Sequence, residues 1–213
     1  MTTRDRLENV IAEACQARGV PGMVVGLLTE QGRQVVEYGV ASVETGCPVR
    51  RDTLFQIGSI TKVYLATLAM RLVEEGKLAL DTPVISYLLD LELADPAARE
   101  AITLRHLLTH TSGLEGDRFD DYGYGDDALA RYVAGLREAR QIHPPGRYWS
   151  YCNSGFSLAG RVIEVVTGQA FEDAMRERLF KPLGLERTFF FVQDVLGYPY
   201  ASGHRTNEQG HPE

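Results

Sequence analysis

The chain of 213 residues lacks three features that would each point to a particular class of protein. It contains no run of 18 uncharged apolar residues and no apolar secretion signal near its start, which argues against insertion in a membrane or export. Cysteine occurs only three times, so a disulfide framework is not expected. The 22 basic residues are scattered and outnumbered by 29 acidic ones, which disfavours nucleic acid and anionic membranes as partners. We therefore expect a cytoplasmic protein with one substantial core.

The pattern of apolar residues predicts an α+β fold. Apolar residues spaced three and four apart indicate a helix from about Arg4 to Arg18. The segments 23–29 and 34–41 are expected to be strands of an antiparallel hairpin that turns at 30–33. A helix followed by such a hairpin is a typical start for an α/β lobe.

The rest of the chain is expected to be mainly helix and loop. The stretch from 59 to about Gly76 is apolar on every side, which predicts a buried central helix. Shorter helices are expected at 104–108 and around residues 129–136, 158–166 and 171–179. Because no repeat or low-complexity linker occurs, we expect one catalytic domain over 1–213. Its parts would be an α/β lobe portion at 1–57, a mainly helical lobe at 58–187 and the start of a return to the sheet at 188–213.

Ser59-Ile60-Thr61-Lys62 stands at the start of the central helix. Residues three apart lie on the same face of a helix, so the Lys62 amine can reach the Ser59 hydroxyl. Burial of the helix disfavours a charged lysine, and a neutral amine can accept the serine proton. The pair therefore suggests covalent acyl transfer. The alternative is that Ser59 only caps the helix, while Lys62 extends into solvent.

A second group of candidate residues precedes a helix that is expected to begin near Ser154. It contains Tyr151 and Asn153, two residues apart on a loop. A tyrosine beside a lysine cation can carry protons, because the cation favours its phenolate. The asparagine amide offers a donor and an acceptor to a substrate amide. A second proton carrier and a group that binds the substrate amide are parts of a site that Ser59 and Lys62 alone do not provide.

The segment 115–127 is rich in acidic, glycine and aromatic residues. It lacks the spacing of a calcium loop, so we interpret it as a mobile, solvated surface loop, and the rim of a site is a further interpretation. Tyr148 and Trp149 either line an acyl pocket or wedge their loop against the core, and the sequence does not decide between these roles.

Two other features have a catalytic and a structural interpretation. His106 and His110 have the spacing of zinc ligands in a protease, but position 107 is Leu where that motif has Glu, so packing is favoured. Cys152 lies between two candidate residues, and a buried packing role is favoured over a reactive thiol.

Several stretches of the chain together carry a family resemblance. They are Asp52 to Lys62, Gly76 to Val84, Ile102 to Leu114, Tyr151 to Asn153 and Pro182 to Leu185. In this order they resemble the serine β-lactamase and penicillin-binding protein-like superfamily, in its branch of class C β-lactamases, D-alanyl-D-alanine carboxypeptidases and esterases. The resemblance covers nearly the whole chain. It implies that superfamily's α+β fold, with an N-terminal helix, the strands of an incomplete sheet and a large helical region.

The resemblance also implies roles for the candidate residues. Ser59 would be the acylated nucleophile, and Lys62 would be its partner in proton transfer. Tyr151 would act as general base for acylation and for the deacylating water, while Asn153 would hold the substrate's amide. The backbone N–H of Ser59 would supply one oxyanion donor. No metal or cofactor is implied, and the division of the proton between Lys62 and Tyr151 is left open.

One motif of the superfamily has no counterpart here. A Lys-Thr-Gly or His-x-Gly, which supplies the second oxyanion N–H from a late strand, does not follow Tyr151. We therefore expect an N-terminal portion of a longer protein. The alternative is a natural short homologue that is completed as a homodimer or by another chain. Loss of one oxyanion donor costs about 10²–10³ in rate, so little or no turnover is expected of these 213 residues alone.

The sequence thus predicts a serine hydrolase that cleaves a small-molecule ester, an amide or a D-amino-acid peptide through an acyl-enzyme. Peptidoglycan crosslinking and antibiotic defence take place outside the cytoplasm. The expected location therefore favours an esterase, amidase or D-amino-acid peptidase over a dedicated β-lactamase. The competing hypothesis is a weak or inactive homologue that keeps the fold for binding or assembly. The presence of all four candidate residues (Ser59, Lys62, Tyr151 and Asn153) argues against this second hypothesis. The missing Lys-Thr-Gly or His-x-Gly motif argues for it.

Overall fold

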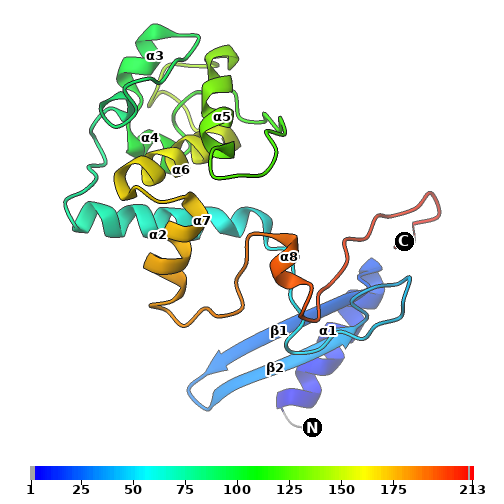
Figure 1. Cartoon of the computed structure of the whole chain (residues 1–213). Helices are drawn as coiled ribbons and strands as arrows, with labels where there is room; N and C mark the ends of the chain where they lie inside the picture. The colour runs from blue at the N-terminus through cyan, green and yellow to red at the C-terminus, as the bar shows by residue number, and fades with distance from the viewer. Residues whose placement is uncertain (1–2, 211) are drawn as a thin grey trace. The chain divides into compact units, whose positions relative to one another are not determined.

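The computed structural model describes residues 3–210 and 212–213, which form two compact units (Figure 1). One unit combines the described residues up to Ile57 with those from Phe189 onward, and the other is Gly58–Thr188. Helices and an antiparallel pair of strands confirm the predicted α+β class. No helix in the described part of the chain is long and apolar enough to cross a membrane.

The first unit is built on helix α1 (Thr3–Arg18) and the hairpin of β1 (Gly22–Thr29) and β2 (Gly32–Gly39). Ile11 and Cys15 of α1 pack against Val36 of β2, which gives this unit its core. Residues from Phe189 onward add helix α8 (Val192–Val195) and a parallel bridge between Tyr200 and Leu54. Among the described residues, the sheet consists of the two strands β1 and β2, and the segment after Phe189 adds no further strand to it.

The hairpin differs from the prediction in the length of its turn and in the bounds of its second strand. Thr29 pairs with Gly32, so the turn has two residues rather than the four at 30–33. Strand β2 ends at Gly39 rather than at residue 41, because Gly39 has φ +70° and its backbone leaves the extended conformation. Val40 then forms only an isolated bridge with Pro48. Glycines at both ends therefore decide the length of the second strand.

The second unit is mainly helical. In chain order its elements are η1 (Gly58–Ile60), α2 (Thr61–Glu74), η2 (Val84–Ser86), α3 (Pro96–Ala101), α4 (Leu104–Leu108), α5 (Ala128–Gly135), η3 (Leu136–Glu138), α6 (Asn153–Thr167), α7 (Phe171–Met175) and the π-helix η4 (Arg176–Phe180). Helix α6 contacts α2, α4, α5 and α7 (Figure 1). Its residues Leu158, Val162 and Ile163 are fully buried. This helix is thus the centre of the unit.

The predicted helices of this unit are confirmed, with three corrections. The helix expected around 171–179 is α-helical only over Phe171–Met175 and continues as the π-helix Arg176–Phe180. Helix α3 was not expected, because its sequence contains no large apolar residue that would show a helical pattern, although Asp95 caps it. The central helix was expected to be buried on every side, but Val63 and Met70 are exposed while Leu68 and Leu72 are buried. Its packing partners in this unit are α6, α7 and η4, so the helix is buried along part of its surface rather than on every side.

Candidate active site

The candidate nucleophile lies just before helix α2. Ser59 is the middle residue of η1, a single turn of 3-10 helix, and α2 begins two residues later at Thr61. The N-cap of α2 is Ile60, and no side chain caps this helix. The interpretation of Ser59 as a helix cap is therefore wrong, and its hydroxyl is available for other contacts.

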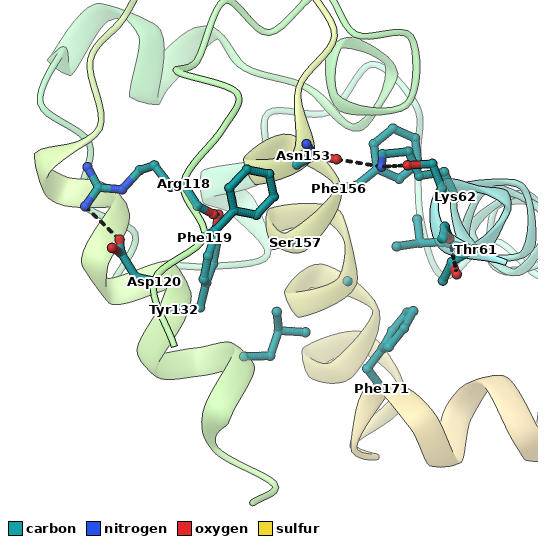
Figure 2. A pocket seen from close by; sticks show the side chains of 15 residues that line it. Thr61, Lys62, Arg118, Phe119, Asp120, Tyr132, Asn153, Phe156, Ser157 and Phe171 are labelled. Atoms are coloured by element: carbon teal, nitrogen blue, oxygen red, sulfur yellow. Dashed lines mark hydrogen bonds and ion pairs between the residues drawn. The ribbon is translucent and has the colours of Figure 1, made fainter. Parts of the chain in front are cut away.

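The structure brings the four predicted site residues together. The hydroxyl oxygen of Ser59 accepts hydrogen bonds from Lys62 Nζ at 3.1 Å and from the Tyr151 hydroxyl at 2.7 Å. Lys62 Nζ also donates to Oδ1 of Asn153 at 2.7 Å (Figure 2). Lys62 is half-buried and does not extend into solvent. One lysine thus connects the nucleophile with both residues of the second motif.

The electrostatics of the site favour an ionisable tyrosine. Lys62 Nζ lies 4.7 Å from the centroid of the Tyr151 ring and 5.5 Å from that of Phe156. The side chain of Lys62, followed by the hydroxyl of Ser59, lowers the pKa of the Tyr151 phenol. The phenolate is therefore more accessible than in an ordinary tyrosine, which is the property expected of a proton carrier.

The start of α6 is held in place by the backbone of Gly116. The carbonyl of Gly116 accepts hydrogen bonds from the N–H groups of Asn153 at 3.0 Å and Ser154 at 3.1 Å. A Cβ atom on Gly116 would lie 2.5 Å from the carbonyl oxygen of Tyr151, so only glycine permits this approach. Loop 115–127 therefore holds Asn153 through backbone hydrogen bonds and lies close to the backbone of Tyr151.

Cys152 has a structural role. Its thiol is almost fully buried, and Sγ accepts the N–H of Gly155 at 3.2 Å, which caps α6. Burial raises the pKa of the Cys152 thiol, so the reactive thiolate is disfavoured. The predicted packing role is thereby supported.

Both histidines of the expected packing pair have defined contacts. His106 accepts the N–H of Thr103 at Nδ1, and Thr103 in turn accepts the N–H of His106, which forms a capping box at the start of α4. The ring of His110 stacks on Tyr151, with a centroid distance of 4.4 Å. Its Nδ1 accepts the N–H of Cys152 at 3.0 Å. Sequence reasoning assigned His110 to packing but did not connect it with the site.

Asp117 is a site residue that the sequence did not single out. Its Oδ1 accepts a hydrogen bond from Nδ2 of Asn153 at 2.9 Å. The acidic composition of loop 115–127 was the only signal, and chain spacing does not indicate which carboxylate turns toward the site. The interpretation of this loop as a site rim is thus supported by an exposed residue whose carboxylate reaches inward.

A cavity of about 560 Å³ adjoins the candidate nucleophile (Figure 2). Ser59, Lys62 and Asn153 are among its polar lining residues. Apolar side chains line most of the remainder, namely Leu65, Phe119, Leu129, Phe156 and Phe171. An ion pair between Arg118 and Asp120, 3.1 Å apart, also borders it.

Tyr148 and Trp149, the two exposed aromatic residues before Tyr151, do not line this cavity. Trp149 instead presents an edge to His110, and Tyr148 presents an edge to His143. The pocket interpretation of these aromatics therefore does not hold for this cavity.

Comparisons with known proteins show the family to which the chain is related. The family model described as Beta-lactamase matches residues 7–213. Penicillin-binding protein 4 of Amycolatopsis lactamdurans is 41% identical over 87% of this chain and 49% of its own length. Esterase EstB of Burkholderia gladioli is 34% identical over 93% of this chain and 55% of its own length.

Solved structures give the same result. The octameric penicillin-binding protein homologue from Pyrococcus abyssi has a TM-score of 0.84 at 29% identity, covering 100% of this chain and 50% of that one. The D-alanine carboxypeptidase AmpC from Burkholderia cenocepacia has a TM-score of 0.78 at 32% identity, covering 99% of this chain and 56% of that one. The chain spans about half the length of the curated relatives it matches. The predicted resemblance is confirmed, and the chain belongs to the Beta-lactamase family.

Proposed function

We propose that the chain carries the catalytic centre of a serine hydrolase that forms an acyl-enzyme on Ser59. The observation that carries this proposal is the double contact of the Ser59 hydroxyl, which lies within hydrogen-bond distance of both Lys62 Nζ and the Tyr151 phenol. A serine needs a neighbouring base to become a nucleophile, and this geometry supplies two candidate groups. Relatives named as a β-lactamase, an esterase and a D-alanine carboxypeptidase support the hydrolase class.

In the acylation step, Oγ of Ser59 attacks the carbonyl carbon of an ester or amide. Its proton passes to the coupled pair of Tyr151 and Lys62, which titrates as a unit. The leaving alcohol or amine takes up this proton as its bond to the carbonyl carbon breaks. The acyl group remains on Ser59 as an ester. The backbone N–H of Ser59, in the turn before α2, is the proposed donor to the developing oxyanion.

Deacylation uses the same groups in reverse. Tyr151 takes a proton from a water molecule, which attacks the carbonyl carbon of the acyl-enzyme. The bond to Oγ then breaks, Ser59 regains a proton and the carboxylic acid leaves. Asn153 lies beside Lys62 and is proposed to hold a polar group of the substrate next to the scissile bond.

The substrate class that fits the cavity is an ester or amide with an apolar portion. Most of the cavity wall is apolar, and Ser59, Lys62 and Asn153 line it together with the Arg118–Asp120 ion pair. Burial of an apolar side group there contributes about 25 cal/mol per Å² of buried surface. An ester or amide with such a group could therefore be oriented by hydrophobic contact, with its carbonyl near the nucleophile.

The test is covalent labelling of the 213-residue chain. A fluorophosphonate should form a phosphorus–oxygen bond to Ser59 as fluoride leaves, and intact-mass analysis with peptide mapping should locate the adduct. A penicillin should acylate the same residue. Ser59→Ala is the control and should remain unlabelled. No adduct on a well-folded wild-type chain would overturn the proposal for this chain and favour the competing role in binding or assembly.

A further inference from the structure

The chemistry of its neighbours determines the orientation of the Asn153 amide. Lys62 Nζ, 2.7 Å from one amide atom, acts as a donor, so it needs the amide oxygen. The ionised carboxylate of Asp117, 2.9 Å from the other amide atom, is only an acceptor, so it needs the amide nitrogen. Only one of the two flipped orientations satisfies both neighbours. The opposite orientation would place two donors together at Lys62 and two acceptors together at Asp117.

This arrangement forms a chain of contacts from the loop to the nucleophile. The carboxylate of Asp117 accepts a hydrogen bond from Asn153 Nδ2, and Asn153 Oδ1 accepts one from Lys62 Nζ. Lys62 Nζ in turn donates to Ser59 Oγ at 3.1 Å. Asn153 is half-buried, whereas Asp117 is exposed at the rim. Without Asp117, only Lys62 would still favour this orientation of the Asn153 amide, and Nδ2 would lose the one side-chain acceptor that it has among the described residues.

We propose that Asp117 is a positioning residue, which orients the amide of Asn153 and thereby keeps Lys62 between Ser59 and Tyr151. The effect on catalytic rate rests on the proposed function, while the effect on Lys62 does not. Misplacement of a catalytic group by about 1 Å can cost about 10² in rate. Asp117 therefore acts on the reaction through two intermediate side chains, although it touches neither the nucleophile nor the proton carrier.

The competing explanation is that Asp117 acts only through its charge. The titratable and charged groups around Tyr151 are Lys62, His110 and Asp117. Lys62 lowers the pKa of Tyr151, whereas the negative charge of Asp117 raises the pKa of that phenol. Loss of charge alone should therefore lower the Tyr151 pKa. Loss of positioning should raise it, because Lys62 would move away from the phenol. The two explanations therefore predict changes of opposite sign in the Tyr151 pKa when Asp117 is replaced.

The first experiment measures the direction of the change in the Tyr151 pKa and needs no enzymatic activity. Tyrosines labelled with ¹³C at the ring carbon that bears the hydroxyl are titrated by NMR, and Tyr151→Phe assigns the resonance. Asp117→Leu removes the acceptor, and we expect it to raise the Tyr151 pKa. Asp117→Asn keeps an acceptor oxygen but loses the charge, and we expect an unchanged or lower pKa. A lower pKa in both variants would overturn the positioning role.

The second experiment measures fluorophosphonate labelling of Ser59. Asp117→Leu should slow labelling by about 10²-fold, and Asp117→Asn should restore most of the rate. Asp126→Leu is the matched control, because it removes an exposed acidic residue of the same loop that has no hydrogen bond to the site among the described residues. It should label at the wild-type rate. Equal loss of rate in the Leu and Asn variants at position 117 would overturn the proposal.

The two proposals fail in different ways. If wild-type Ser59 is not labelled but Asp117→Leu still raises the Tyr151 pKa, the hydrolase proposal fails and the positioning role stands. If labelling is normal in wild type and unaffected by Asp117→Leu, the positioning role fails and the hydrolase proposal stands. Unchanged circular dichroism of the variants is required in both experiments, and Asp117→Asn provides a second variant if Asp117→Leu does not fold.

Discussion

The imidazole of His110 lies stacked on the phenol of Tyr151, with ring centroids 4.4 Å apart and ring planes inclined by 29°. His110 has φ +58°, in the left-handed region that non-glycine residues enter only infrequently, although Asn, Asp and His do so more often than others. The turn after α4 thus adopts an unfavourable backbone conformation that places this ring against the candidate proton carrier. Because Nδ1 accepts the N–H of Cys152, the neutral imidazole is the form that fits this position.

The first prediction concerns stability at mildly acidic pH. Burial, followed by the charge of Lys62, lowers the pKa of His110 below its ordinary value of 6.5. As pH falls below 6.5, the unfolded chain binds a proton at this residue before the folded chain does, so the free energy of unfolding decreases. We expect His110→Asn to show a smaller decrease than wild type between about pH 7 and about pH 5.5. Asparagine is chosen because it tolerates positive φ.

The measurement is urea unfolding followed by the fluorescence of Trp149, the single tryptophan of the chain, which lies in the helical unit. Midpoints and slopes are compared at several pH values for both proteins. The two proteins will differ in absolute stability, because the variant loses ring contacts, so only the change with pH is diagnostic. An identical pH dependence in wild type and variant would show that His110 does not carry a lowered pKa.

The second prediction concerns the pH profile of Ser59 labelling. The side chain of Lys62, followed by Ser59, lowers the pKa of Tyr151, so labelling should rise with pH with a midpoint below the ordinary tyrosine value of about 10. Lys62→Met should move this midpoint upward and slow labelling by about 10²–10⁴-fold. Tyr151→Phe should abolish the rise. Initial rates by intact-mass analysis provide the measurement, and an unchanged midpoint in Tyr151→Phe would assign the titration to another group.

The third prediction concerns the close approach of loop 115–127 to the start of α6. A Cβ at Gly116 would lie 2.5 Å from the carbonyl oxygen of Tyr151 and 3.2 Å from Cα of Cys152. Both are backbone atoms that cannot turn away, so Gly116→Ala must separate the two segments. We expect a loss of about 1–3 kcal/mol in the free energy of unfolding. Labelling of Ser59 should also slow, because the Asp117–Asn153 contact spans the same gap. Urea unfolding by Trp149 fluorescence measures the first effect.

Local signals in the sequence were sufficient for much of the helical unit. The helix Leu104–Leu108 was predicted with its observed bounds, because Thr103 provides a local cap and the apolar pattern is short and clear. The Ser59–Lys62 contact followed from spacing alone, since one turn of helix brings residues three apart onto the same face. The hairpin was predicted, but the length of its turn and the bounds of its second strand were not, because these depended on the conformation of individual glycines.

The parts of the site that escaped prediction depend on contacts between distant segments. Asp117 meets Asn153 across 36 residues, and nothing local distinguishes it from the other acidic residues of its loop. His110 stacks on Tyr151 from a backbone with positive φ, a conformation that the sequence alone does not indicate. In both cases the tertiary fold selects one residue from several of similar chemistry, so the sequence pattern identifies the segment but not the residue.

The fourth prediction concerns Gly160, on the face of α6 that borders the cavity. A Cβ at this position would meet only side-chain atoms, with Leu129 Cδ2 at 3.2 Å, Phe171 Cδ2 at 3.6 Å and Leu65 Cδ1 at 3.8 Å. Leu129 must shift by a few tenths of an ångström, and it can do so because it lines the open cavity. Alanine also removes the entropic penalty of glycine within a helix. We therefore expect Gly160→Ala to stabilise the helical unit by about 0.4–1 kcal/mol in urea unfolding, opposite in sign to Gly116→Ala. A destabilisation would mean that Leu129 is held rigidly and that the cavity wall cannot adjust to a bound group.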